Sequence, residues 1–80
     1  MLRYWAAARH AAGVAEEPVA ASTLAQALAA ARAGHGPELS RVLQICSFLV
    51  DEQPVGIRDP ATVELVEGAV VDVLPPFAGG

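Results

Sequence analysis

The sequence predicts a single small α+β domain, in which one main helix packs on one face of a small mixed sheet. Two observations lead to this prediction. First, 54% of the 80 residues are hydrophobic, which is enough to form a compact core. Second, strand-like segments are interspersed with helical ones in the order strand, helix, strand, helix, strand, strand. A chain of this length suits one domain, so we assign residues 1–80 to it.

The N-terminal part predicts a strand followed by a short helix. Residues 2–5 include the strand-favouring Tyr and Trp. Residues 6–12 are rich in alanine, and Gly13 follows at the point where a helix would end. Beyond it we expect a turn at residues 16–18, because Glu-Glu-Pro is a turn signal, and a second strand around Val19.

The main helix is predicted from the spacing of apolar residues between Leu24 and Ala31. Either Ser22 or Thr23 can cap its start, because a hydroxyl oxygen accepts a hydrogen bond from a free backbone N–H group. The Gly-His-Gly-Pro sequence at residues 34–37 ends the helical pattern.

The second half of the chain predicts a helical turn followed by strands. Proline and glutamate at its start suit a first helical turn, and the later apolar runs are separated by turn residues. The expected elements are a helical turn over 37–42, a strand over 43–50, a turn over 51–54, a second sheet edge at Val55, a short piece over 63–66 and a last strand over 69–74.

The last six residues are the most informative part of the chain. Pro75 and Pro76 end the last strand, because proline cannot donate ladder hydrogen bonds, and they favour an extended tail over residues 75–80. The final Ala-Gly-Gly has almost no side-chain bulk, so it would fit a narrow tunnel in another protein and place the Gly80 carboxylate there. Gly79-Gly80 alone is also typical of a frayed end, but the compact domain and the strand before it favour a functional tail.

Three segments resemble the MoaD/ThiS family of ubiquitin-like β-grasp sulfur carriers, and within it the MoaD carriers. Residues 3–13 are similar to the first strand and helix of that family, residues 48–55 to its central hairpin, and residues 71–80, with their Pro-Pro-x-x-Gly-Gly ending, to its C-terminus. Residues 67–69 depart from the family, which often has an acidic residue where this chain has alanine after the glycine. The resemblance implies a β-grasp fold.

The resemblance also implies a mechanism. A MoeB-like enzyme would use ATP to adenylate the Gly80 carboxylate, and sulfur from a sulfurtransferase would displace AMP to leave a thiocarboxylate. The slender end at Gly79 would let the tail enter a MoaE-like large subunit of molybdopterin synthase, which makes the dithiolene of the molybdenum cofactor. The chain itself would be a non-catalytic carrier subunit with no cofactor of its own.

Apolar contact positions on the sheet follow from the same resemblance. If Val71 and Val73 face the core, Leu74 lies on the opposite face of the sheet. An exposed apolar patch there would mark a partner surface, whereas the alternative is that Trp5 and Leu74 belong to the core. The expected partner contacts are Trp5, Pro54, Leu74, Pro75, Pro76 and Phe77.

Other functions remain open from the sequence. Carriers for thiamin synthesis, cysteine synthesis or tRNA thiolation would share the same tail chemistry. A ubiquitin-like modifier would instead join Gly80 to lysines of target proteins, and a plain interaction module would have an inert tail. Partner binding, isopeptide adducts and deletion of the two glycines distinguish these hypotheses.

Composition weighs against several classes of partner and site. The net charge is −4 and the five arginines are scattered, which argues against nucleic acid. No signal peptide or apolar run of about 20 residues is present, so we expect a cytoplasmic protein without a membrane partner.

The reactive residue types are predicted to be structural. Cys46 is the only cysteine and lies in an apolar run, which favours a buried, inert thiol and excludes an internal disulfide. We expect His10 and His35 to be surface histidines and no metal site. The acidic pairs at residues 16–17 and 51–52 are interpreted as solvated turn charges rather than paired catalytic carboxylates.

Overall fold

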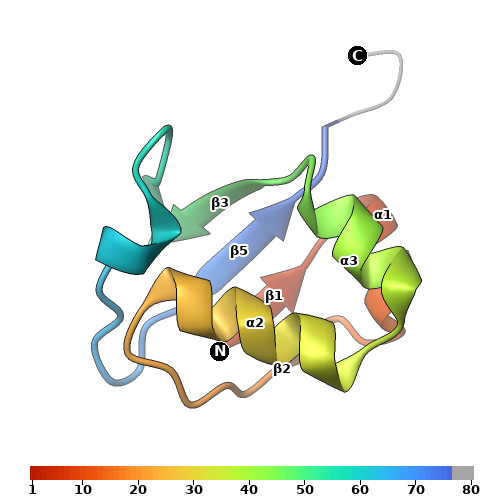
Figure 1. The fold of residues 1–80 in the computed structure, drawn as a ribbon, viewed down its shortest axis with the longest axis horizontal. Coiled ribbons are helices and arrows are strands. Elements are labelled where there is room, and N and C mark those ends of the chain that lie inside the picture. Colours follow the sequence, from red (N-terminus) through yellow and green to blue (C-terminus); the bar gives the residue numbers. More distant parts are fainter. Residues whose placement is uncertain (77–80) are drawn as a thin grey trace.

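The computed structural model describes residues 1–76, which form a five-stranded sheet with helices packed against it (Figure 1). The elements in chain order are β1 (Leu2–Tyr4), α1 (Ala6–Ala12), β2 (Glu16–Glu17), α2 (Leu24–Gly34), α3 (Pro37–Leu43), β3 (Ser47–Val50), β4 (Gln53–Pro54), the 3₁₀ helix η1 (Pro60–Thr62) and β5 (Val71–Leu74). Within residues 1–76, no helix is long and apolar enough to cross a membrane.

The sheet is mixed, as the sequence predicts, and its strand order is β2-β1-β5-β3-β4. β5 is the central strand: it pairs parallel with β1 and antiparallel with β3. The outer pairs, β1 with β2 and β3 with β4, are antiparallel. The last strand along the chain is therefore held on both sides by earlier strands.

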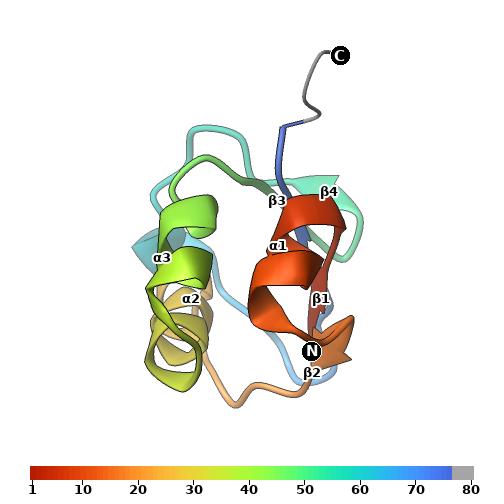
Figure 2. The same cartoon turned by 90° about the vertical axis from the view of Figure 1, so that its right-hand side faces the viewer.

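The helices lie on one side of the sheet, which gives two layers with the core between them (Figure 2). The main helix α2 buries the apolar face that the spacing of its residues predicts. From the sheet, β1 and β5 contribute every second residue to the same core. The largest fully buried side chains are Tyr4, Leu2, Leu24, Leu39, Val71 and Val73. The predicted α+β architecture is confirmed, with α1 and α3 accompanying α2 on the same side.

Local hydrogen bonds explain where two of the helices begin and end. The Thr23 side chain accepts a hydrogen bond of 3.2 Å from the Gln26 backbone N–H, so Thr23 rather than Ser22 caps α2. Gly13 follows α1 with φ of 78°, and its N–H donates to the Arg9 carbonyl at 2.9 Å. The predicted glycine stop is confirmed, because this left-handed conformation is costly for other residues.

The second strand lies earlier than predicted. Residues 16–17 form β2 rather than a turn, with Glu16 opposite Arg3 and Glu17 opposite Leu2. Val19 follows β2 and packs, partly buried, against the core. The prediction of a strand at Val19 was wrong because β1 supplies the backbone partners for residues 16–17, and that pairing is not visible in the local sequence.

The predicted strand over 43–50 starts too early. Leu43 is the last residue of α3 and is buried in the core, and only Ser47–Val50 form β3. An apolar run can belong to a buried helix end as well as to a strand, so the pattern alone does not separate the two. The strand expected over 69–74 likewise begins later, at Val71.

The hairpin between β3 and β4 has a two-residue loop. Asp51 and Glu52 have φ of 48° and 69°, and β4 consists of Gln53–Pro54, so the second edge comes just before Val55 rather than at it. The piece expected over 63–66 forms no strand in the described chain and makes only an isolated bridge, between Glu64 and Thr23.

Candidate functional site

The face of the sheet opposite the helices is the candidate docking surface. Side chains alternate along each strand, so the residues between the core positions point to this side. Among residues 1–76 no helix covers it (Figure 2). We call this surface the outer face, and by strand register it comprises Arg3, Trp5, Ser47, Leu49, Pro54, Val70, Asp72 and Leu74.

Trp5 and Leu74 lie next to each other at the end of the outer face from which the tail leaves. The register pairs Tyr4 with Val73, and the Trp5 backbone N–H donates to the Val73 carbonyl at 3.2 Å, so Trp5 comes level with Leu74. Trp5 is 47% exposed and Leu74 is partly exposed. The alternative that Trp5 is a core residue is therefore wrong.

Pro54 lies on the outer face beside Leu49, which the sequence analysis did not predict to be on this face. Leu49 on β3 lies opposite Pro54 on β4 and, on its other side, opposite Asp72 on β5. Pro54 is exposed and Leu49 is partly buried. The alternation of Phe48 toward the core and Leu49 away from it was the signal that could have identified Leu49.

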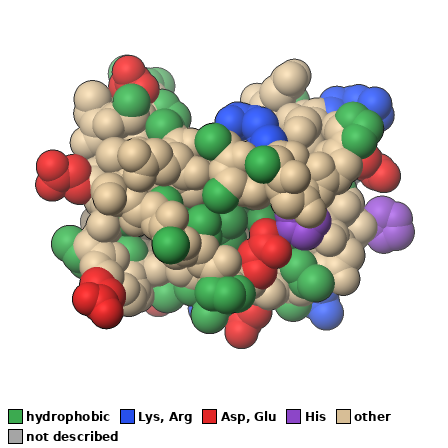
Figure 3. All heavy atoms as spheres, turned by 60° about the horizontal axis from the view of Figure 1, so that its bottom comes forward, with side chains coloured by type: hydrophobic (Ala, Val, Ile, Leu, Met, Phe, Trp, Pro, Cys, Tyr) green, Lys and Arg blue, Asp and Glu red, His purple; other side chains and the backbone are tan. Residues whose placement is uncertain are grey.

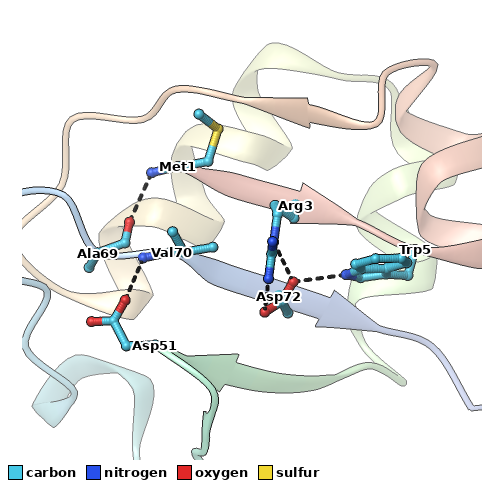
Figure 4. A network of polar contacts seen from close by, with 7 residues as sticks. All are labelled: Met1, Arg3, Trp5, Asp51, Ala69, Val70 and Asp72. Carbon is cyan, nitrogen blue, oxygen red and sulfur yellow. Dashed lines mark hydrogen bonds and ion pairs between the residues drawn. The ribbon is translucent and has the colours of Figure 1, made fainter.

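A charged group lies in the middle of this otherwise mostly apolar surface. Asp72 is only 4% exposed, and its carboxylate accepts three hydrogen bonds (Figure 4). Arg3 donates from Nε at 2.8 Å and from Nη2 at 2.9 Å, and the Trp5 Nε1–H donates at 2.8 Å. The Arg3 hydrogen bonds, helped by that of Trp5 and opposed by burial, lower the pKa of Asp72.

The root of the tail continues directly from β5. Pro75 is buried and Pro76 is exposed. Phe77, Gly79 and Gly80, which were predicted to contact a partner or to carry the chemistry, lie outside the described residues. The structure thus brings Trp5, Leu74 and the start of the tail to one end of the sheet, with Pro54 further across the outer face.

Two residues predicted to be solvated form a cluster instead. The Tyr4 hydroxyl donates to Glu17 Oε1 at 2.6 Å, and His35 Nε2 lies 2.8 Å from the same oxygen. Burial opposes ionisation of Glu17, but the hydrogen bonds from Tyr4 and His35 outweigh it and lower the pKa of Glu17. Burial, followed by the hydrogen bond to Glu17, raises the pKa of Tyr4. The predictions of a free turn charge at Glu17 and a surface position for His35 were wrong. The two residues are 18 positions apart in the sequence and come together only in the folded chain.

Another reactive group that the sequence singled out in the described part of the chain is Cys46. Cys46 is partly buried, its Sγ donates to the Val42 carbonyl at 3.1 Å, and burial raises the pKa of Cys46 to about 11. This fits the inert thiol that the sequence predicts. Within residues 1–76, no three His, Cys, Asp or Glu residues are grouped so as to hold a metal ion. On the face in Figure 3 the basic side chains are separated from one another.

Solved structures show the same fold. The solution structure of small archaeal modifier protein 1 (SAMP1) from Methanosarcina acetivorans matches with a TM-score of 0.85 and 19% identity, over 99% of this chain and 93% of that one. The crystal structure of SAMP1 from Haloferax volcanii gives 0.74 and 21%, over 99% and 96%. The complex of subunits 1 and 2 of molybdopterin-converting factor from Helicobacter pylori 26695 gives 0.69 and 22%, over 99% and 95%.

The sequence itself identifies the family. A search of curated proteins finds no significant match. The profile of the ThiS family, however, matches residues 2–80, which is nearly the whole chain. Small ubiquitin-like carriers of this kind are generally non-catalytic. The chain therefore belongs to the ThiS family, and it has the ubiquitin-like β-grasp fold.

Proposed function

We propose that this chain is the small subunit of a molybdopterin synthase and carries sulfur as a thiocarboxylate on Gly80. Gly80 is then the C-terminal residue of the working carrier, and Gly79 keeps the end slender enough to enter an active site. A MoeB-like enzyme consumes ATP to adenylate the Gly80 carboxylate. Adenylation is needed because a free carboxylate is a poor electrophile. A sulfurtransferase then provides the sulfur, which displaces AMP because AMP is a good leaving group.

One observation carries the proposal: β5, the central strand, leads directly into the Pro-Pro-Phe-Ala-Gly-Gly sequence, and Trp5 and Leu74 lie at that same end of the outer face. A partner that receives the tail can therefore contact the outer face at the same time. The structural similarity to the complex of two molybdopterin-converting factor subunits supports a large subunit as that partner.

Intact-mass spectrometry tests the tail chemistry. The purified chain is incubated with ATP, a MoeB-like adenylating enzyme and a sulfurtransferase. We expect a gain of about 16 Da, the difference between sulfur and oxygen, when the carboxylate becomes a thiocarboxylate. A variant that lacks Gly79 and Gly80 is the control and should gain nothing. If the full chain gains no mass with any adenylating enzyme of this type, the proposal fails.

Binding to a MoaE-like large subunit tests the pathway. Leu74→Glu places a charge beside Trp5 on the outer face, and we expect it to weaken binding by about tenfold or more. Val66→Glu is the matched control, because Val66 is also an exposed apolar residue but lies in the loop before β5, away from the tail. Equal losses in the two variants would count against the outer face as the docking surface.

A second candidate is a protein modifier. Two structural neighbours are named small archaeal modifier proteins, and a terminal Gly-Gly would suit conjugation to lysines of other proteins. This chain has no lysine, so it cannot form chains on itself through side-chain amines. Higher-mass adducts in cells that vanish when Gly80 is deleted would favour this candidate. Carriers for thiamin, cysteine or tRNA thiolation share the mass gain and differ in failing to bind the large subunit.

A further inference from the structure

Trp5 is a large side chain on an open surface, yet its one polar atom is held in place. The indole is 47% exposed, and Ala6, directly after it, has φ of 48°, so the chain bends sharply from β1 into α1. Trp5 Nε1–H donates to Asp72 Oδ1 at 2.8 Å, and the Arg3 guanidinium carbon lies 5.9 Å from the centre of the ring. Both contacts act on the indole from the side where Arg3 and Asp72 are paired, and together they fix the ring orientation (Figure 4).

Asp72 is an unusual choice for its position. It sits on the central strand and is 4% exposed, where an apolar residue would need no hydrogen-bond partners. A buried ion pair is weak evidence for added stability, since a well-packed apolar residue in the same place is often as good or better. The carboxylate does fix the positions of Arg3 and Trp5 relative to each other. One of its oxygens accepts from both Arg3 and Trp5, and the other accepts from Arg3.

We infer that Asp72 is a positioning residue, which holds the Trp5 indole across the outer face beside Leu74 before a partner arrives. Arg3 contributes by neutralising the carboxylate and by lying within 5.9 Å of the centre of the indole ring. Ordering a side chain in advance removes part of the entropy cost that binding would otherwise incur. The effect of Asp72 on docking rests on the proposed function, whereas its effect on Trp5 does not.

The fluorescence of Trp5 tests the positioning directly, because Trp5 is the only tryptophan in the chain. Asp72→Val removes both acceptor oxygens and introduces a strand-favouring side chain. Asp72→Asn keeps the size but meets the Arg3 guanidinium with an amide. Both donors reach water, so the fold should persist. We expect lower fluorescence anisotropy of Trp5 and stronger acrylamide quenching in Asp72→Val, and a smaller change in Asp72→Asn, whose amide oxygen can still accept from the indole N–H. Glu67→Gln, on an exposed residue, is the charge-matched control and should change neither.

The docking role is tested by a double-mutant cycle with the MoaE-like large subunit. Asp72→Val should weaken binding roughly two- to tenfold, as expected for freeing one large side chain. In a Trp5→Phe background, which has no indole N–H to position, the same substitution should have almost no further effect. A merely structural role of Asp72 would weaken binding equally in both backgrounds.

Each outcome bears on a separate statement. Unchanged anisotropy and quenching in both Asp72 variants would overturn the positioning of Trp5. Additive losses in the cycle, or wild-type affinity in Asp72→Val, would overturn its role in docking. If the wild-type chain does not bind the large subunit at all, the proposed function fails and the docking role with it, while the fluorescence comparison still decides whether Asp72 positions Trp5. Should Asp72→Val fail to fold, Asp72→Leu, which also lacks an acceptor oxygen, carries the same comparison.

Discussion

The Tyr4 hydroxyl and the Glu17 carboxylate are joined by a hydrogen bond of 2.6 Å between neighbouring strands β1 and β2. The same carboxylate oxygen lies 2.8 Å from His35 Nε2, just after α2, and the rings of Tyr4 and His35 meet edge to face at 6.0 Å. Glu17 thus links the edge of the sheet to the end of the main helix. This cluster closes the side of the core farthest from β4.

Tyr4→Phe should lower the free energy of unfolding by about 1–2 kcal/mol, since it removes a hydrogen bond to a charged group from a side chain that is 2% exposed. Urea denaturation near neutral pH measures the change. Glu17→Gln keeps an acceptor oxygen and should cost less. A Tyr4→Phe variant as stable as the wild type would show that water replaces the hydroxyl without loss.

Acid should destabilise the domain through Asp72 and Glu17. Both have pKa values lowered in the folded chain, Asp72 chiefly by its hydrogen bonds with Arg3 and Glu17 by those from Tyr4 and His35, which outweigh burial. The unfolded chain then binds protons first, so their contribution is complete above the usual carboxyl pKa of about 4 and is lost as the pH falls through the lower folded values. Urea midpoints measured across this range should fall less steeply in Asp72→Asn than in the wild type; parallel curves would contradict the assignment.

Removing the hydroxyl of Thr23, which caps α2, should destabilise the domain more than removing that of its neighbour Ser22. Thr23→Ala should cost about 1 kcal/mol of stability, because the Gln26 N–H loses its acceptor. Ser22→Ala is the matched control: Ser22 is exposed and precedes the cap, so loss of its hydroxyl should change stability by less than about 0.5 kcal/mol. Thermal denaturation of the two variants makes the comparison, and a larger effect at Ser22 would contradict the capping geometry.

Substitution by alanine should change the stability of the domain in opposite directions at two glycines. Gly13→Ala places a Cβ at φ of 78° and should destabilise the domain by about 1 kcal/mol. Gly34 lies within α2, with open space where a Cβ would go, so Gly34→Ala should stabilise by up to about 1 kcal/mol. Chemical denaturation of both variants measures the change in the free energy of unfolding. If both substitutions stabilise the domain, helix propensity rather than the left-handed conformation determines the effect at Gly13.

Local signals were enough to predict the fold class and the main helix. A capping hydroxyl, helical spacing and glycine breaks act within a few residues. The sequence alone therefore narrows the cap to Ser22 or Thr23 and correctly predicts the roles of Leu24 and Gly13. The alternation in β5 also placed Val71 and Val73 toward the core and Leu74 away from it. These features depend on neighbours along the chain, which a sequence displays directly.

Long-range partners account for the errors. Glu17 resembled a turn charge because its partners, Tyr4 and His35, lie 13 and 18 residues away. The alternation that places Leu74 on the outer face places Asp72 there too, but the hydrogen bonds of Asp72 depend on Arg3 and Trp5, near the opposite end of the chain. Such contacts form only when the sheet assembles, and spacing in one sequence does not encode them.

The central place of β5 also determines when this domain becomes complete during synthesis. β1 and β3 have no common neighbour until residues 71–74 have emerged from the ribosome, since β5 is the strand that pairs with both. Most of the core must therefore wait until β5 has been made, and pairing of β1 with β5 joins Leu2–Tyr4 to Val71–Val73. A nascent chain interrupted before β5 would have no strand to join β1 to β3, so completion of the sheet depends on this one strand.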